Sequence, residues 1–304
     1  MAESDRVIDR SAPIVKARAA ERPSGRHINL SRWAVVPTLV WTAIIFAAPI
    51  VFMVVVSFWD RVSGKLEATW DFANYAKFFS KSYLLEGLFN SIEVSLITAG
   101  ISVVLAYPLA YVLAYQVPQR WQKFLLVLCI LPFWTSYLVR SYAWSVILSE
   151  TGVLNTVLLG IGVIDDPVQL GYTRGATVLG FTHFFTMLLT LTIYANLVQI
   201  SKSYRLAAAD LGASKIQVFL RITLPLSIPG IAIGAFITFV ITMGDFITPQ
   251  ILGGSNEMLL PQAIILQIQR ANDLPMASAM SLMLMITVTI AYFLFARWLR
   301  MDRV

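Results

Sequence analysis

Few side chains in this 304-residue sequence could do chemistry, and they are scattered along it. The one cysteine, Cys129, lies in an apolar run, and the two histidines, His27 and His183, are far apart. A metal site needs several His, Cys or carboxylate ligands together, and a nucleophile needs a base beside it. No GxxxxGK[ST] phosphate loop occurs either. We therefore predict no catalytic residue, metal site or cofactor, and we expect that the chain cannot hydrolyse ATP by itself.

Two carboxylates, those of Asp245 and Glu93, are candidate functional groups because they fall in long apolar stretches. A charge inside a bilayer is costly and usually faces a cavity, a partner or a ligand. We expect Asp245 to lie on a path for a cationic solute, beside aromatic rings such as Trp134 or Tyr137. The alternative is a helix-end residue hydrated at the membrane surface. Glu93 is a further path candidate, although a carboxylate at a helix start also suits the helix dipole.

Composition places these residues in a membrane protein, with 58% hydrophobic and 13% charged residues and a mean hydropathy of +0.72. A spanning helix needs about 20 mostly apolar residues. Six segments qualify: 34–58, 91–116, 124–148, 176–198, 228–252 and 277–299. The expected fold class is an all-α membrane protein with about six transmembrane helices over residues 33–304. Residues 1–32 lack apolar periodicity and are expected to form a disordered cytoplasmic tail.

Lys and Arg set the expected orientation, because cytoplasmic loops of membrane proteins carry an excess of both. Sixteen of the 23 lie in the N-terminal tail, the 117–123 turn, the 199–227 loop and the C-terminal tail. Six lie in the three other loops, and Arg140 lies within the third segment. We expect both termini in the cytoplasm. The net charge of +6 follows from this topology and does not indicate nucleic-acid binding.

The 199–227 loop is long and patterned. Residues 203–211 suit a short helix, and Gly212 suits its end, where a left-handed conformation is often required. Ser214 with Gln217 fits a capping box that starts a second short helix, and Pro225 is expected to end that helix. The loop would present small alanines and larger apolar anchors to a partner protein. The alternative is an amphipathic helix pair that rests on the membrane.

This pattern resembles the EAA loop of the permease subunits of ABC importers. The resemblance rests on Ala207-Ala208, then Asp210-Leu211-Gly212-Ala213-Ser214, then Leu224-Pro225. It implies a coupling helix that docks on an ATP-binding subunit. The docking residues so implied are Tyr204, Leu206, Ala207, Ala208, Asp210, Leu211, Gly212, Ala213, Ser214 and Phe219. One departure is Leu206, which stands where the family usually has an acidic residue.

Further segments resemble the first permease subunit of spermidine/putrescine-type importers. They include Gly244-Asp245-Phe246 up to Gly254, Leu131-Pro132-Phe133-Trp134 and Arg140-Ser141-Tyr142. The resemblance covers residues 34–300 and implies the type I importer fold in a bacterial inner membrane. It also implies a second permease, two ATP-binding subunits, a periplasmic or extracellular binding protein and a small cationic solute.

A polyamine is the first expectation for that solute. Opines, amino-acid derivatives, and ferric or thiamine-like solutes stay open, since the binding protein sets much of the selectivity. Two other functions are less well supported. A stand-alone secondary transporter would need coupling carboxylates near mid-membrane and no docking loop. A membrane-embedded enzyme would need a catalytic cluster, which the sequence lacks.

Overall fold

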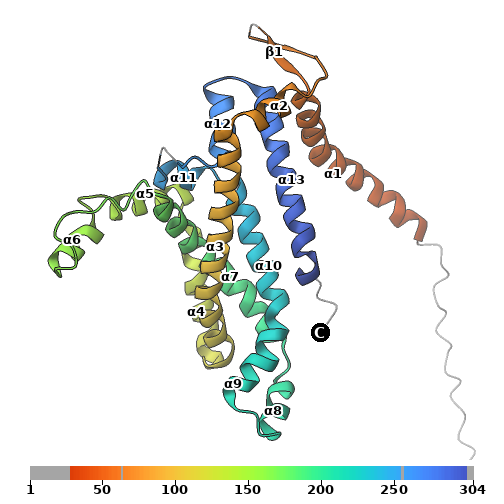
Figure 1. Ribbon diagram of the computed structural model, residues 1–304. Coiled ribbons are helices and arrows are strands. Elements are labelled where there is room, and N and C mark those ends of the chain that lie inside the picture. The colour runs from red at the N-terminus through yellow and green to blue at the C-terminus, as the bar shows by residue number, and fades with distance from the viewer. Residues whose placement is uncertain (1–27, 63, 255–256, 300–304) are drawn as a thin grey trace, which may run out of the picture. The chain divides into compact units, whose positions relative to one another are not determined.

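The computed structural model describes residues 28–62, 64–254 and 257–299, which are mostly helical (Figure 1). The chain divides into two compact units, residues 1–50 and 51–304. Helix α1 (Ile28–Ser57) carries Pro37 and Pro49 inside it. Residues 28–32, expected in the tail, therefore belong to a helix, and the rest of the predicted tail lies outside the described residues.

Five described helices are long and apolar enough to span a membrane, and one bent pair brings the number to six. Three of them form the centre of the second unit: α3 (Ser82–Tyr115), α7 (Arg174–Gln199) and α10 (Leu224–Gly244). Their largest buried cluster includes Tyr107, Phe185 and Leu189. Between helices in lipid, small residues allow the close packing that drives association. At Gly230 of α10, an added Cβ would lie 2.5 Å from the Asn196 Cβ of α7.

The third predicted span, 124–148, is wrong as a single helix. Helix α4 (Gln119–Ile130) passes into a short 3₁₀ turn, η1 (Leu131–Trp134), and α5 (Tyr137–Ile147) then leaves at 87°. Pro132 lacks the N–H that would continue the α-helix. Thr135 and Ser136 are extended, and the chain turns there.

The fifth predicted span, 228–252, has both limits wrong. The helix begins at Lys215 and runs to Gly244 through α9 (Lys215–Val218), η2 (Phe219–Thr223) and α10. The expected stop at Pro225 does not occur. Segment η2 is a π turn in which the Leu224 N–H donates to the Phe219 carbonyl, and Pro225 follows where α10 begins. Beyond Gly244 the chain starts a separate short helix, α11 (Ile247–Leu252).

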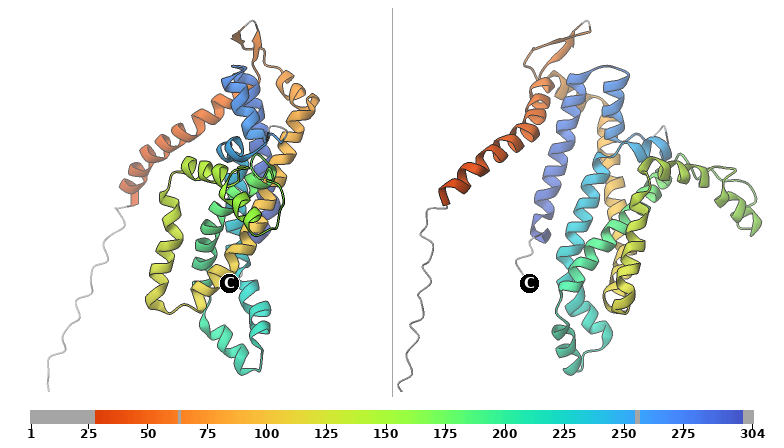
Figure 2. Two further views of the ribbon diagram at one scale, coloured as in Figure 1. Left: turned by 90° about the vertical axis from the view of Figure 1, so that its left-hand side faces the viewer. Right: turned by 180° about the vertical axis from the view of Figure 1, so that it is seen from behind.

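The second unit has two contrasting ends, which Figures 1 and 2 show. We call one of them the α12 end. It holds the antiparallel strands β1 (Asp60–Val62) and β2 (Lys65–Glu67), together with the helices α2 (Ala73–Ser80) and α12 (Leu260–Gln269). At the other, the α8 end, α8 (Lys202–Asp210) and α9 project. Helix α6 (Val153–Gly160) follows α5, and α13 (Leu274–Leu299) returns from the α12 end.

The α12 end is held by its own apolar cluster, which includes Phe78, Leu84, Leu260 and Met280. Helix α2 of this end begins at Ala73. Its Lys77 donates to Asp60 Oδ1 at 3.0 Å, and this hydrogen bond lowers the pKa of the Asp60 carboxyl. This contact holds helix α2 against the strand pair beside it.

Candidate functional site

The loop at the α8 end has the predicted helix–glycine–helix form. Helix α8 covers Lys202–Asp210, Leu211 caps it, and Gly212 has φ +83°. A residue with a Cβ is strained in that conformation. Ser214 Oγ accepts from the Gln217 N–H while Gln217 Oε1 accepts from the Ser214 N–H, which completes the predicted capping box. These local contacts fix the turn between α8 and α9.

The predicted docking residues of this loop are divided between two faces of α8. One face borders an open groove of about 520 Å³, lined by Tyr204, Ala207, Ala208, Leu211, Arg221, Ile222, Pro225 and Leu226. The opposite face borders a pocket of about 310 Å³ that includes Leu206, Ala213 and Tyr111. Leu211 is 89% exposed, so a large apolar side chain stands free at the tip.

Three other predicted docking residues differ in setting. Asp210 and Ser214 are exposed at the turn. Phe219 is half-buried, with its ring centroid 5.8 Å from that of Tyr107 and 5.5 Å from that of Tyr111. It therefore anchors the loop to α3, and it does not belong to the exposed surface.

Asp245 lies between α10 and α11, where the spanning helix is interrupted. Its Oδ1 accepts from the Ile247 N–H at 2.7 Å, and its Oδ2 accepts from Thr248 Oγ1 at 3.0 Å and from the Tyr137 hydroxyl. All three donors are neutral. Among the described residues, no Lys, Arg or His forms an ion pair with this carboxylate. The Asp245 carboxyl group thus has three hydrogen-bond donors but no cationic partner among the described residues.

The two aromatic residues expected beside Asp245 differ in whether they contact it. Tyr137 contacts the carboxylate, whereas Trp134 is 83% exposed and forms no hydrogen bond to it. Arg140 is buried nearby and donates to the Pro132 carbonyl at 3.2 Å. Its guanidinium carbon lies 4.6 Å from the Phe184 ring centroid and 5.5 Å from that of Tyr137. Tyr137 therefore contacts both a carboxylate and a guanidinium.

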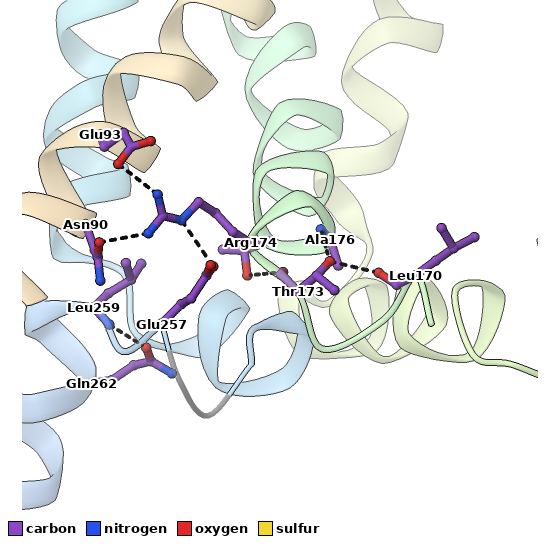
Figure 3. A network of polar contacts seen from close by, with 10 residues as sticks. Asn90, Glu93, Leu170, Thr173, Arg174, Ala176, Glu257, Leu259 and Gln262 are labelled. Carbon is purple, nitrogen blue, oxygen red and sulfur yellow. Dashed lines mark hydrogen bonds and ion pairs between the residues drawn. The ribbon is translucent and has the colours of Figure 1, made fainter. Parts of the chain in front are cut away.

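A polar network at the α12 end was not expected from the sequence (Figure 3). Arg174, the first residue of α7, donates to Glu93 at 2.7 Å, to Asn90 at 2.8 Å and to Glu257 at 3.1 Å. One guanidinium thus ties α7 to α3 and to the segment before α12. Arg174 is the single basic residue of the 149–175 loop, but nothing in its spacing indicates its partners.

This network corrects one interpretation of Glu93. Helix α3 begins at Ser82, eleven residues earlier, so Glu93 does not lie at a helix N-terminus. Its carboxylate pairs instead with Arg174, and 53% of the side chain is exposed. The network is continued by Ser91, whose Oγ accepts from the Leu260 N–H at 2.9 Å. The start of α12 is thereby held against α3.

These elements define the class of protein. Residues 103–301 match the family described as the inner membrane component of binding-protein-dependent transport systems. The chain belongs to this family, and it is therefore a membrane-embedded permease subunit that does not itself hydrolyse ATP.

Individual relatives show which members of this family the chain resembles. The chain is 33% identical over 266 residues to the spermidine/putrescine transport system permease protein PotB of Salmonella typhimurium, covering 87% of this chain and 91% of PotB. It is 32% identical to PotB of Escherichia coli K12, covering 85% and 93%. The inner membrane ABC transporter permease protein YdcU of Escherichia coli K12 is 32% identical over 62% of this chain and 64% of its own length.

Solved structures of low sequence identity share the fold. A chain of a bacterial ABC transporter that imports the acidic polysaccharide alginate superposes with a TM-score of 0.69, covering 88% of this chain and 95% of that one at 18% identity. The same kind of transporter in complex with a periplasmic protein bound to an alginate pentasaccharide gives a TM-score of 0.71 at 17% identity, covering 88% and 92%. The importer permease fold is thus observed here.

The Arg174 network should contribute measurably to stability. Arg174→Gln removes three charge-assisted hydrogen bonds and leaves two carboxylates unpaired, so we expect a loss on the order of 1–2 kcal/mol. Thermal unfolding of the purified protein in detergent measures this loss. The matched variant Lys77→Gln breaks one exposed ion pair and should cost less than about 1 kcal/mol. Equal shifts in the two variants would contradict a special role for Arg174.

Proposed function

We propose that this chain forms half of the translocation path of an ABC importer for polyamines. The observation that carries the proposal is the similarity to spermidine/putrescine permeases along 87% of the chain. In support of it, the Asp245 carboxylate has only neutral donors around it. A cationic solute passing at that point would supply the missing positive charge, because a carboxylate in a bilayer is costly without a counter-charge.

The proposed orientation puts the α8 end in the cytoplasm and the α12 end outside. The excess of Lys and Arg in the 117–123 turn and the 199–227 loop supports it. The loops at the other end carry nine acidic and six basic residues, which favours the approach of a cation. Reporters fused after Gly64 and after Asp166 should therefore score outside, and one fused at Val304 inside; an outside score at Val304 would refute this topology.

We propose a different protein partner for each end of the second unit. At the α8 end we propose that an ATP-binding subunit docks on the groove beside Tyr204, Ala207, Ala208 and Leu211. At the α12 end a substrate-loaded binding protein would deliver the solute. A second, homologous permease would complete the path. The groove and Asp245 lie at the two ends of one continuous 30-residue helix, Lys215–Gly244, which is about 45 Å long.

The docking proposal predicts a specific effect at Gly212. Gly212→Val places a β-branched residue at φ +83°, which costs of the order of 1–3 kcal/mol and should distort the turn that presents Leu211. The variant should stay in the membrane but lose most of its ATP-binding subunit on co-purification. Gly64→Val is the matched control, since Gly64 has the same φ in an open turn at the other end. Equal retention in both variants would argue against docking at this loop.

The substrate proposal is tested on Asp245 in the reconstituted importer. Asp245→Asn keeps the size of the side chain and removes its charge. Uptake of putrescine or spermidine should fall by roughly tenfold or more, because a hydrogen bond to a charged group is worth about 1.5–3 kcal/mol. Basal ATPase activity and assembly should be unchanged. Asp166→Asn makes the same chemical change in an exposed loop and should have no effect.

A panel of an opine, a neutral amino-acid derivative, thiamine and a ferric chelate separates the alternatives. Stimulated ATPase activity with one of these, and none with polyamines, would overturn the polyamine assignment. Unchanged polyamine uptake in Asp245→Asn would leave Asp245 as the residue that caps α11.

A further inference from the structure

A third cavity, which is polar, lies at the α8 end; it shares Lys202 and Arg205 with the pocket of about 310 Å³ but no lining residue with the docking groove. It measures about 470 Å³ and is formed where α3, α4, α7 and α8 end or begin. Its polar lining residues are Tyr115, Gln119, Gln122, Lys202 and Arg205. None of the described residues that line it is acidic. The cavity is therefore a positively charged site with amide and hydroxyl groups at its wall.

Arg205 is held in place there by an aromatic ring. Its guanidinium carbon lies 3.7 Å from the Tyr115 ring centroid, a cation–π contact. The Tyr115 hydroxyl in turn donates to the Leu197 carbonyl at 2.9 Å, which fixes the ring. Gln122 donates to the Val117 carbonyl at 3.1 Å and stiffens the α3–α4 turn beside it. The Arg205 guanidinium is thus held in place by residues at the ends of two helices.

The same guanidinium has unused hydrogen-bonding capacity. Its Nε is buried and has no hydrogen-bond partner among the described residues. A buried N–H without a partner is destabilising, so a ligand that accepts a hydrogen bond from it is favoured. Guanidinium groups fit phosphate oxygens with paired N–H donors, and the Lys202 ammonium adds a second charge.

The position of the cavity distinguishes its ligand from the ATP-binding partner. Lys202 and Arg205 are three residues apart and share one side of α8. The groove residues Tyr204, Ala207 and Leu211 follow another stripe of the helix. On the adjoining first turn of α4, Trp121 is 50% exposed, as is typical of tryptophans at the level of lipid headgroups. The cavity therefore lies next to a helix turn that carries a tryptophan suited to the membrane boundary.

We propose that this cavity binds the phosphate headgroup of an anionic phospholipid of the cytoplasmic leaflet. Arg205 and Lys202 hold the phosphate, and Gln119 contacts the polar part of the headgroup. The leaflet follows from the orientation under the proposed function, whereas the headgroup chemistry does not depend on it. A lipid in this position would bridge the α3–α4 turn and the base of α8.

Native mass spectrometry of the full-length protein, purified with its accompanying subunits, tests the proposal. The protein is exposed to equal amounts of phosphatidylglycerol and phosphatidylcholine, and retained lipid is counted. The wild type should retain phosphatidylglycerol preferentially. Lys202→Gln/Arg205→Gln should lose that preference, with a drop of roughly fivefold for each charge removed. The single variant Lys202→Gln changes an exposed side chain and serves if the pair does not fold.

The control pair Arg120→Gln/Lys123→Gln removes two charges from exposed positions on α4 that do not line the cavity. It should keep the preference. Equal loss in both pairs would mean diffuse electrostatic attraction and would overturn the site, as would no loss in either. Displacement of the lipid by inorganic phosphate alone would overturn the lipid assignment. Because lipid retention is measured without transport, a failed polyamine assay leaves this result unaffected.

Discussion

Every backbone N–H and C=O inside a bilayer must find a partner within the protein, because the lipid offers none. This constraint makes each interruption of a spanning helix a place where other elements have to supply hydrogen bonds. The chain has two such interruptions in the described bundle, at Thr135–Ser136 and at Asp245–Phe246. Side chains from both come together, since Tyr137 opens α5 and donates to Asp245, which also accepts from the first N–H of α11. The two breaks are thus hydrogen-bonded to each other through the Tyr137 hydroxyl and the Asp245 carboxylate.

The two ends of the bundle are specialised in opposite ways. At the α12 end, Arg174 pairs with both Glu93 and Glu257 and holds three segments together. At the α8 end, apolar side chains such as Leu211 and Ile216 are left largely exposed, and cations line a cavity. One end is thus stabilised by its own contacts, whereas the other leaves room for partners. The central packing of α3, α7 and α10, with glycine at its closest approach, connects them.

The fold does not decide the charge of the solute. A chain of a transporter for acidic alginate has the same fold at 18% identity. Under the proposed function, side chains along the path would set the charge of the solute, and Asp245, whose three donors are all neutral, is the residue proposed to favour a cation. A substrate assignment in this family therefore depends on individual residues more than on architecture.

The membrane class, the helical fold and the form of the 199–227 loop could all be predicted from the amino-acid sequence. These follow from local properties: apolar segment length, the left-handed preference at Gly212, and the capping pair Ser214 and Gln217. Even there, local rules failed at Pro225, where the π turn before it lets the helix continue. Only the tertiary structure decided that the third span is bent by 87°, because the direction after a break depends on what it packs against. It also decided which residues Arg174 and Arg205 contact, and that Tyr137 is the aromatic residue that reaches Asp245. Those contacts join residues between 81 and 108 positions apart, and no spacing rule extends that far.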